Sequence, residues 1–299
     1  MKIGVQLPEV ERVVPWVELR EMAVTAERIG LDSIWVGDHL LYRGDGKPAR
    51  GPWEAWTTLA ALAAVTERVE IGPLVASTSF HNPAMLAKMA ATIEEISGGR
   101  LILGLGAGWN KVEYGAYGFP FDHRVSRFEE AFTIVRELLT TGRSDFRGEY
   151  HQVEDGELLP RGPRPEGPPL MVGSIGDRML AITLPHVSSW NAWHAWFGND
   201  VDGYLPLRDR IDDACRKAGR DPAEVERTLA LLVAFPGALG RGSAVTEAQP
   251  DPIDGDPATL VPMLRGFAEA GVAHVQLVLD PITVESIAAL EPTVAALAG

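Results

Sequence analysis

The sequence predicts an α/β fold, a (β/α)8 TIM barrel with insertion segments, formed by one domain over residues 1–299. Short apolar runs alternate with amphipathic runs along the chain, and this alternation is typical of parallel strands joined by helices. The length of 299 residues suits one such barrel, and the 46% content of hydrophobic residues is enough for a sizeable core. An open doubly wound sheet is the alternative.

The first half of the chain contains four strand–helix units. Strands are expected where short apolar runs occur, at residues 2–7, 33–36, 69–75 and 101–105. Helices are expected after them, at residues 17–29, 52–64, 83–97 and 124–140. Pro52 and Pro83 stand at two helix starts, and Gly30 and Gly98 follow two helix ends, which are the positions that these residue types prefer.

The second half repeats the pattern after an insertion. Residues 144–169, SDFRGEYHQVEDGELLPRGPRPEGPP, alternate and then become rich in Pro and Gly, which indicates a hairpin and a linker over the end of the barrel. Strands are expected at residues 170–173, 188–191, 226–234 and 274–279, and helices at 177–184, 204–218, 257–270 and 284–297. Residues 237–255 are polar and Gly-rich and are expected to form a loop.

Charge and cysteine content exclude several classes of protein. The formal net charge of -14 argues against nonspecific nucleic-acid binding and against attraction to an anionic membrane. Cys215 is the only cysteine, so no intrachain disulfide is possible, as is usual in the cytoplasm. The N-terminal residues contain no long apolar run, and no run of about 18 apolar residues occurs, so we expect a cytoplasmic protein without signal peptide or membrane span.

The second strand ends in an acid and a histidine. In SIWVGDHL, Asp38 and His39 directly follow the strand, and active sites of (β/α)8 barrels lie at the C-terminal ends of their strands. A histidine at this position can move protons near neutral pH, and Asp38 can stabilise the imidazolium or bind a ligand. The alternative is an Asp38 that caps a loop beside a solvent-exposed His39.

Glycines and aromatic residues follow the other strands. After the fourth strand, in LGLGAGWN, three glycines allow close approach to a ligand, and Trp109 and Asn110 add a flat apolar face and an amide. The third glycine of a dinucleotide fingerprint is missing there, because Trp109 occupies its place. After the sixth strand, Trp190, Trp193 and Trp196 form a cluster that walls a pocket or, alternatively, packs as a loop or a subunit contact.

The fifth strand ends in a turn, Gly173 to Gly176, that precedes a helix. Free main-chain amides at such a position can hold a phosphate, whereas the alternative is an ordinary tight turn capped by Asp177. The seven histidines are scattered without metal-ligand spacing, and HExxH and CxxC motifs are absent, so no metal is expected. A metal hydrolase whose ligands are brought together only by folding remains a distant alternative.

Three sequence blocks resemble the bacterial luciferase-like family of flavin and deazaflavin oxidoreductases. They are RIGLDSIWVGDHL, the long block ERVEIGPLVASTSFHNPAMLAKMAATIEEISGGRLILGLGAGWNKVEYGAYGFPF, and SRFEEAFTIVRELL, and the resemblance extends from the first residue to about residue 190. The family implies a (β/α)8 barrel that binds reduced FMN or coenzyme F420, with the ring over the barrel mouth. The long block looks most like F420-dependent members, as does the Ala-, Gly-, Arg- and Pro-rich composition.

The resemblance also assigns site residues. It implies a non-prolyl cis peptide at Leu74–Val75 behind the ring, and it places His39 near the reactive face of the ring. Residues that match cofactor contacts in the family are Asp38, Ala107, Asn110, Gly173, Ser174, Ile175 and Gly176. Trp109 stands where the sugar-phosphate dehydrogenase branch has an acidic glutamate, which argues against sugar-phosphate oxidation.

The resulting hypothesis is an F420-dependent oxidoreductase that transfers a hydride between the deazaflavin and a small, largely apolar organic substrate. His39 donates or accepts the accompanying proton, and Trp109, Trp193 and Trp196 line the substrate side. The first alternative is an FMNH2-dependent two-component monooxygenase with a partner flavin reductase. The second alternative is a non-catalytic flavin-binding barrel. The family resemblance also implies a homodimer, formed through helices near the second and third strands.

Overall fold

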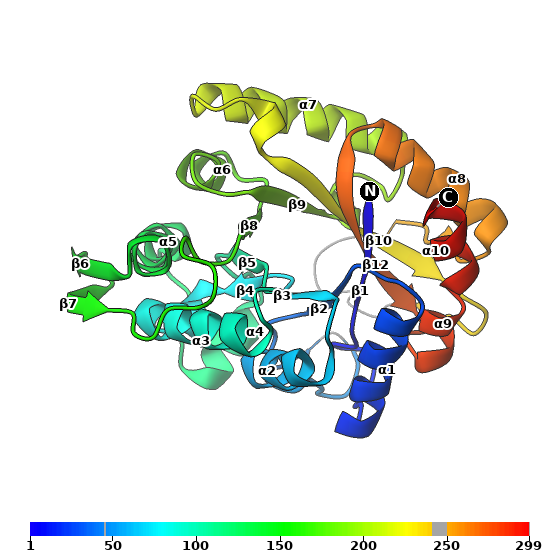
Figure 1. The fold of residues 1–299 in the computed structure, drawn as a ribbon, viewed down its shortest axis with the longest axis horizontal. Coiled ribbons are helices and arrows are strands. Elements are labelled where there is room, and N and C mark those ends of the chain that lie inside the picture. Colours follow the sequence, from blue (N-terminus) through cyan, green and yellow to red (C-terminus); the bar gives the residue numbers. More distant parts are fainter. Residues whose placement is uncertain (45, 241–249, 299) are drawn as a thin grey trace.

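Parallel strands form a ring with helices around it (Figure 1). The computed structural model describes residues 1–44, 46–240 and 250–298, so residues 241–249 of the expected loop at 237–255 lie outside the described residues. The ring consists of β1 (Lys2–Gln6), β2 (Ser33–Val36), β3 (Glu70–Pro73), β4 (Ala76–Ser77), β5 (Leu103–Gly106), β8 (Leu170–Gly173), β9 (Ser189–Trp193), β10 (Glu226–Ala234) and β12 (Val272–Asp280). The predicted TIM barrel is therefore confirmed.

The third barrel strand is interrupted and consists of two pieces, β3 and β4, which lie at the two ends of the sheet and close the ring. Hydrogen bonding runs in the order β3-β2-β1-β12-β10-β9-β8-β5-β4, so the two ends of the path are consecutive in the chain. A parallel bridge between Ile71 and Leu101 joins β3 to the residues before β5, and β4 pairs with β5 directly. Between β3 and β4 lies a non-prolyl cis peptide, Leu74–Val75, as the family resemblance predicts.

Helices cover the outside of the ring. They are α1 (Trp16–Arg28), α2 (Ala55–Val65), α3 (Pro83–Ile96), α4 (Lys111–Tyr117), α5 (Arg124–Thr141), α6 (Asp177–Thr183), α7 (Val201–Lys217), α8 (Pro257–Glu269), α9 (Val284–Ala288) and α10 (Glu291–Ala298). Short 3-10 turns, η1 (Thr78–Phe80), η2 (His194–Trp196) and η3 (Pro222–Glu224), occur in the connections, and a short strand β11 (Ile253–Asp254) pairs with β10. No helix among the described residues is long and apolar enough to cross a membrane.

The hairpin predicted in the insertion is present, but it lies outside the ring beside α5 and not over the end of the barrel. Strands β6 (Arg143–Arg147) and β7 (Gln152–Glu157) pair antiparallel beside the C-terminal end of α5. The carboxylate of Glu130 accepts hydrogen bonds from the main-chain N–H groups of residues 149, 150 and 151, which holds the hairpin loop against α5. Figure 1 shows this hairpin outside the ring, beside α5.

The structure differs from several helix predictions; for example, the helix expected at 204–218 begins earlier, at Val201. The helix expected from residue 52 begins at Ala55, because the carboxylate of Glu54 caps the N–H groups of Trp56 and Thr57. The helix expected at 284–297 is divided into α9 and α10, and Pro292 lies in the first turn of α10, where a proline is tolerated. The short helix α4 was not expected from the sequence.

The inside of the ring is packed with side chains below the strand ends. Trp35, Leu74, Met171 and other buried apolar residues form a cluster inside the barrel, separate from the larger core between sheet and helices. This inner cluster leaves no open channel at the middle of the barrel, as expected for an eight-stranded parallel barrel. Leu74 also lines the pocket described below, so the inner core forms the floor of that pocket.

Candidate active site

A pocket of about 430 Å³ lies at the C-terminal ends of the strands. Its walls come from the segments that follow β1, β2, β4, β5, β8 and β9. Twelve of the residues predicted from the sequence line it: Asp38, His39, Leu74, Val75, Ala107, Trp109, Gly173, Ser174, Ile175, Gly176, Trp193 and Trp196. Folding thus brings segments that are far apart in the sequence to one site.

The floor of the pocket is apolar and closely packed. A Cβ atom added at Gly106 would lie 2.9 Å from the Cγ2 of Val75, and one at Gly173 would lie 3.2 Å from the same side chain. Glycine at these two positions therefore lets the Val75 side chain stand between β5 and β8. At Gly108 the φ angle is +73°, and an added Cβ would meet the Tyr114 hydroxyl at 2.1 Å, so no other residue fits there.

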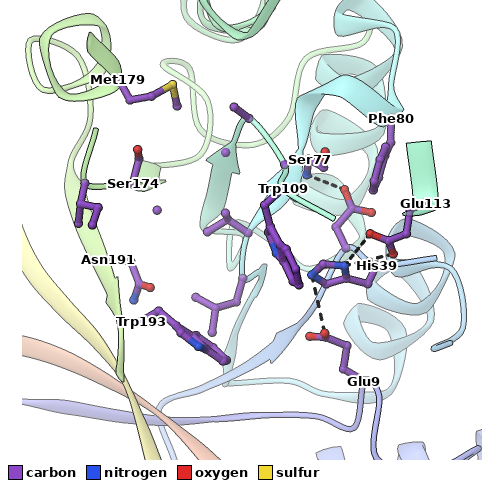
Figure 2. A pocket seen from close by; sticks show the side chains of 18 of the residues that line it. Glu9, His39, Ser77, Phe80, Trp109, Glu113, Ser174, Met179, Asn191 and Trp193 are labelled. Atoms are coloured by element: carbon purple, nitrogen blue, oxygen red, sulfur yellow. Dashed lines mark hydrogen bonds and ion pairs between the residues drawn. The ribbon is translucent and has the colours of Figure 1, made fainter. Parts of the chain in front are cut away.

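His39 is held by a carboxylate from α4. Its Nδ1 lies 3.0 Å and 3.2 Å from the two carboxylate oxygens of the fully buried Glu113 (Figure 2). Glu113 also accepts hydrogen bonds from the main-chain N–H groups of Leu40 and Leu41, at 2.6 Å and 3.0 Å. A carboxylate only accepts hydrogen bonds, so Nδ1 donates and Nε2 is the nitrogen left for proton exchange.

A second carboxylate stands on the other side of the imidazole. The Nε2 of His39 lies 3.8 Å from Oε1 of Glu9, which follows β1 and accepts hydrogen bonds from Gln6 Nε2 and the Tyr42 hydroxyl. Burial by itself lowers the pKa of His39. The charge of Glu9 and the hydrogen bond to Glu113 outweigh burial, so the pKa of His39 is raised above its ordinary value of 6.5.

Asp38 is held by the main chain at Ser77 and by the side chain of His81. Its Oδ2 accepts a hydrogen bond from the main-chain N–H of Ser77 at 2.8 Å and lies 3.0 Å from Nε2 of His81. The ring of His81 packs edge-on against Trp56, with 5.8 Å between ring centroids. No hydrogen bond joins the other carboxylate oxygen, Oδ1, to a described residue, and Asp38 lines the pocket, so Oδ1 is available to a ligand.

Aromatic rings surround the exposed part of His39. Trp109 stands edge-on to His39 with ring centroids 5.5 Å apart, and Tyr42 lies 4.8 Å from His39 and 6.3 Å from Trp109. Trp193 and Trp196, at the end of β9 and in η2, line another part of the wall. The third tryptophan of the predicted cluster, Trp190, is fully buried and donates to the carbonyl of Ser174 instead.

The turn at residues 173–176 lies on the side of the pocket away from His39. Figure 2 shows Ser174 and Met179 there, across the space from Glu113 and His39. The turn leads into α6, and the guanidinium of Arg210 donates to the carbonyl of Ile175 and to the carboxylate of Asp177. No hydrogen bond joins the main-chain N–H of Ser174 or Ile175 to another described residue, so both can donate to a ligand.

Asn110 is not among the residues that line the pocket. It is buried at the start of α4, and its Nδ2 donates to the carbonyl of Leu41 at 3.1 Å. The structure therefore places Asn110 behind the wall, where it holds the loop after His39. The predicted contact of Asn110 with a cofactor ring edge stays a prediction, and in this placement its Nδ2 already donates to the protein.

Sequence reasoning missed several polar residues of the site, among them Glu9, Glu113 and Asn191. Glu9 follows the first strand, and a check of every strand end would have included it, as it included Asp38 and His39. Glu113 lies in the unpredicted helix α4, and no sequence signal pairs it with His39. Asn191, at the wall, gives both its N–H groups to Thr228 and Gln276, at 2.8 Å and 2.7 Å, which leaves its Oδ1 for the pocket.

Within the described part of the chain, no group of three or more His, Cys, Asp or Glu side chains is placed to hold a metal ion. The polar groups of the pocket are instead a histidine between two carboxylates, a third carboxylate with a free oxygen, and main-chain amides on the far side. This arrangement can hold and exchange a proton beside a bound ring, and it can bind an anionic group at some distance from that proton.

Comparison with known proteins gives both a family and individual relatives. Residues 1–236 match the model of the luciferase-like monooxygenase family. Over 225 residues the chain is 40% identical to the F420-dependent glucose-6-phosphate dehydrogenase of Amycolatopsis mediterranei, a match that covers 73% of this chain and 65% of that protein. It is 33% identical over 244 residues to a pyrimidine monooxygenase RutA of Methylorubrum extorquens, covering 74% and 62%.

The matched region is shorter than these relatives. The chain spans less than two thirds of the length of both curated proteins. Among solved structures, an F420-dependent secondary alcohol dehydrogenase in complex with an F420–acetone adduct has a similar fold, with a TM-score of 0.80 at 21% identity over 99% of this chain and 98% of that one. At this identity the similarity concerns the fold alone, which agrees with the barrel described above.

Proposed function

The chain belongs to the luciferase-like monooxygenase family, and from this membership we propose that it is an F420-dependent oxidoreductase that transfers a hydride between the deazaflavin and a small, largely apolar organic substrate. The observation that carries the proposal is the placement of His39. Its Nε2 faces a pocket with an apolar floor, between two buried carboxylates that favour a proton on the ring. The name of one relative, an F420-dependent dehydrogenase, supports F420 as the cofactor.

The pocket fits a flat ring with an anionic tail. Leu74, Val75 and Ala107 form an apolar surface on which a ring would rest, and Asp38 offers a free carboxylate oxygen at its edge. The main-chain N–H groups of Ser174 and Ile175 would hold a phosphate at the far side of the pocket, together with Gly173 and Gly176, where no side chain obstructs it. When bound there, F420 supplies the carbon that gives or takes the hydride.

His39 is proposed to hold the proton that accompanies the hydride. Glu113 keeps Nδ1 as a donor, so the proton would be gained and lost at Nε2, the nitrogen without a hydrogen bond to a carboxylate. The carboxylate of Glu9, 3.8 Å from Nε2, stabilises the protonated ring. At this distance it forms no hydrogen bond with Nε2 that would compete with the substrate. Trp109, Trp193 and Trp196 would line the substrate side and exclude water from it.

The first experiment is a titration of the purified protein with F420 and, separately, with FMN, followed by fluorescence quenching. Tight binding of F420 with weak binding of FMN is expected. Preference for FMN would overturn the proposal, and binding of neither would remove the basis for the role of His39. A Gly173→Val variant tests the site itself, since the added side chain would press on Val75 at the floor of the pocket and should weaken binding of either cofactor.

A second function is supported by another relative. The RutA protein at 33% identity is a monooxygenase, and this name favours an FMNH2-dependent two-component monooxygenase, supplied with reduced flavin by a partner flavin reductase. The two functions differ in a direct assay. With NADH, FMN and a flavin reductase present, a monooxygenase forms an oxygenated product from its substrate and oxygen, whereas the proposed dehydrogenase changes the absorbance of F420 without oxygen.

We also propose that the protein is a cytoplasmic homodimer. The helices expected at the contact are α2 and α3, and Met85 on α3 is more than half exposed. Light scattering after size-exclusion chromatography should give a mass about twice the 32.3 kDa of one chain. A mass of one chain at micromolar concentration would contradict the dimer.

A further inference from the structure

Three carboxyl groups meet at one end of the pocket. Glu9, Asp38 and Glu113 all line it, and they are only 6%, 3% and 0% exposed. Figure 2 shows Glu9 and Glu113 on either side of His39. Because these groups are buried, water and salt screen them little, and their field extends into the pocket. His39 lies between Glu9 and Glu113, and His81 lies 3.0 Å from Asp38, so two imidazoles face three carboxyl groups.

Cationic side chains are absent from the described part of the wall, since none of the lining residues there is lysine or arginine. Guanidinium groups instead donate to main-chain carbonyls of lining residues: Arg50 to Val10, Arg124 to Gly108 and Arg210 to Ile175. The guanidinium of Arg50 lies over the Tyr42 ring, 5.8 Å from its centroid, but it already donates to Val10. An anionic group on a substrate at this end would therefore lose its hydration without a cationic lining side chain as partner.

The aromatic rings of Trp109 and Tyr42, beside His39, also disfavour an anionic ligand. Trp109 and Tyr42 both lie within 5.5 Å of the His39 ring, and 6.3 Å from one another. The faces of tryptophan and tyrosine rings carry negative electrostatic potential, which attracts cations and flat polar rings and disfavours anions. The exposed face of Trp109, a 43% exposed side chain, is available for such a contact.

We propose that the end of the pocket around Glu9, His39 and Trp109 selects substrates by charge. It accepts a flat, uncharged or cationic molecule and excludes one that carries a carboxylate or phosphate. The inference rests on the proposed function only in taking this end as the substrate site. By this proposal, the substrate of this chain differs in charge from that of the relative whose name specifies a sugar phosphate.

The test compares three small rings of similar size and different charge, benzyl alcohol, benzylamine and benzoate. Their dissociation constants are measured by ligand-observed NMR titration of the full chain at neutral pH, without cofactor. We expect benzoate to bind about tenfold or more weakly than benzyl alcohol, and benzylamine to bind at least as tightly as the alcohol. Equal affinity of benzoate and benzyl alcohol would overturn the proposal, as would the absence of binding by both the alcohol and the amine.

Single substitutions test whether the buried carboxyl groups cause the preference for uncharged or cationic ligands. Glu9→Gln keeps the shape of the side chain and removes its charge. The ratio of the dissociation constants of benzoate and benzyl alcohol should therefore fall about threefold. Glu21→Gln, on the exposed face of α1, removes the same charge at a distance and should leave the ratio unchanged. If Glu9→Gln does not fold, Asp38→Asn provides the same comparison.

A substitution of Trp109 tests whether the three ligands bind at this end of the pocket. Trp109→Ala should weaken all three ligands, and unchanged affinities would show that they bind elsewhere, which would also overturn the proposal. Neither cofactor nor turnover enters these measurements. Failure of F420 to bind would therefore contradict the proposed function and leave the charge preference standing, whereas equal binding of anions would contradict the charge preference alone.

Discussion

His39 has acidic partners from two distant parts of the chain. Glu113, 74 residues later, fixes Nδ1, and Glu9, before the second strand, faces Nε2. The net result is a raised pKa, with one nitrogen committed to the protein and the other turned to the pocket. The raised pKa favours the protonated ring relative to an ordinary histidine, and the ring can still release its proton when negative charge leaves its surroundings.

Replacement of His39 by alanine should separate catalysis from binding. We expect His39→Ala to lower kcat by about 10²- to 10⁴-fold, the usual contribution of a general acid or base, with little change in the dissociation constant for F420. Steady-state kinetics and fluorescence titration measure the two quantities. His186→Ala, which removes an exposed imidazole, is the control. Equal loss of turnover and cofactor affinity would make His39 a binding residue instead.

Replacement of Glu113 by glutamine should change the titration of His39. The variant removes the charge and the ionic hydrogen bond that raise the pKa of His39, so that pKa should fall. The protonated form then disappears at a lower pH, and the pH profile of any reaction that uses this proton shifts in the same direction. NMR titration of the imidazole C–H signals measures the pKa directly.

The control for this prediction is Glu21→Gln, which removes a carboxylate from the surface of α1. The glutamine oxygen at position 113 can still accept the N–H groups of Leu40 and Leu41, so the loop after β2 keeps its anchor. An unchanged pKa of His39 in Glu113→Gln would mean that Glu113 serves only to hold that loop.

At the scale of the elements, a histidine connects three strands at the opposite end of the barrel. His274 on β12 forms a hydrogen bond of 2.7 Å with the hydroxyl of Ser33 on β2, across β1. The bond passes over Gly4, where an added Cβ would lie 1.9 Å from the Ser33 hydroxyl. The indole of Trp35 donates to the same hydroxyl, so glycine on β1 is required for the whole group.

His274 should make the protein sensitive to acid. Burial, with smaller effects from Lys2 and the N-terminus, lowers the pKa of His274 to about 3, so this side chain is neutral in the folded state. In the unfolded chain it binds a proton below its ordinary pKa of 6.5. Stability from this group is therefore present above pH 6.5 and falls as the pH decreases from there toward 3, by about 1.4 kcal/mol per pH unit.

The measurement is the free energy of unfolding by urea between pH 7 and pH 4, for the wild type and His274→Gln. The variant carries no titrating group at this position, so its stability should decrease less steeply than that of the wild type. Glutamine can still form a hydrogen bond with Ser33, which limits the loss of stability at neutral pH. Parallel curves for the two proteins would show that His274 is not neutral in the folded state.

At the scale of the whole molecule, ligand binding at the barrel mouth joins segments from most of the chain. A ligand that binds only the folded state stabilises it by mass action, so F420 at about 100 times its dissociation constant should raise the free energy of unfolding by about 2.7 kcal/mol. Thermal unfolding with and without F420 measures this change. His39→Ala should keep it, because His39 is assigned to proton exchange, whereas absence of any shift would contradict F420 binding.

Much of this architecture could be predicted from the sequence, because the signals are local. Apolar runs at a period of two or 3.6 residues, together with proline and glycine at the helix boundaries, located the barrel strands and most helices to within a few residues. Asp38 and His39 were recognisable because they follow a buried strand, and the strand ends of a barrel face one site. The cis peptide at Leu74–Val75 came from the family resemblance and agrees with the structure.

Tertiary structure decided which groups meet. The pairing of His39 with Glu113 and Glu9, and of Asp38 with His81, depends on packing between elements that are far apart in sequence, and no local pattern encodes it. The hydrogen bond from Asn110 Nδ2 to Leu41 likewise follows from the place of Asn110 at the start of a helix that was not predicted. The sequence by itself determined the barrel and the residues at its mouth, whereas the grouping of three buried carboxyl groups with His39 and His81 emerged only when the chain folded.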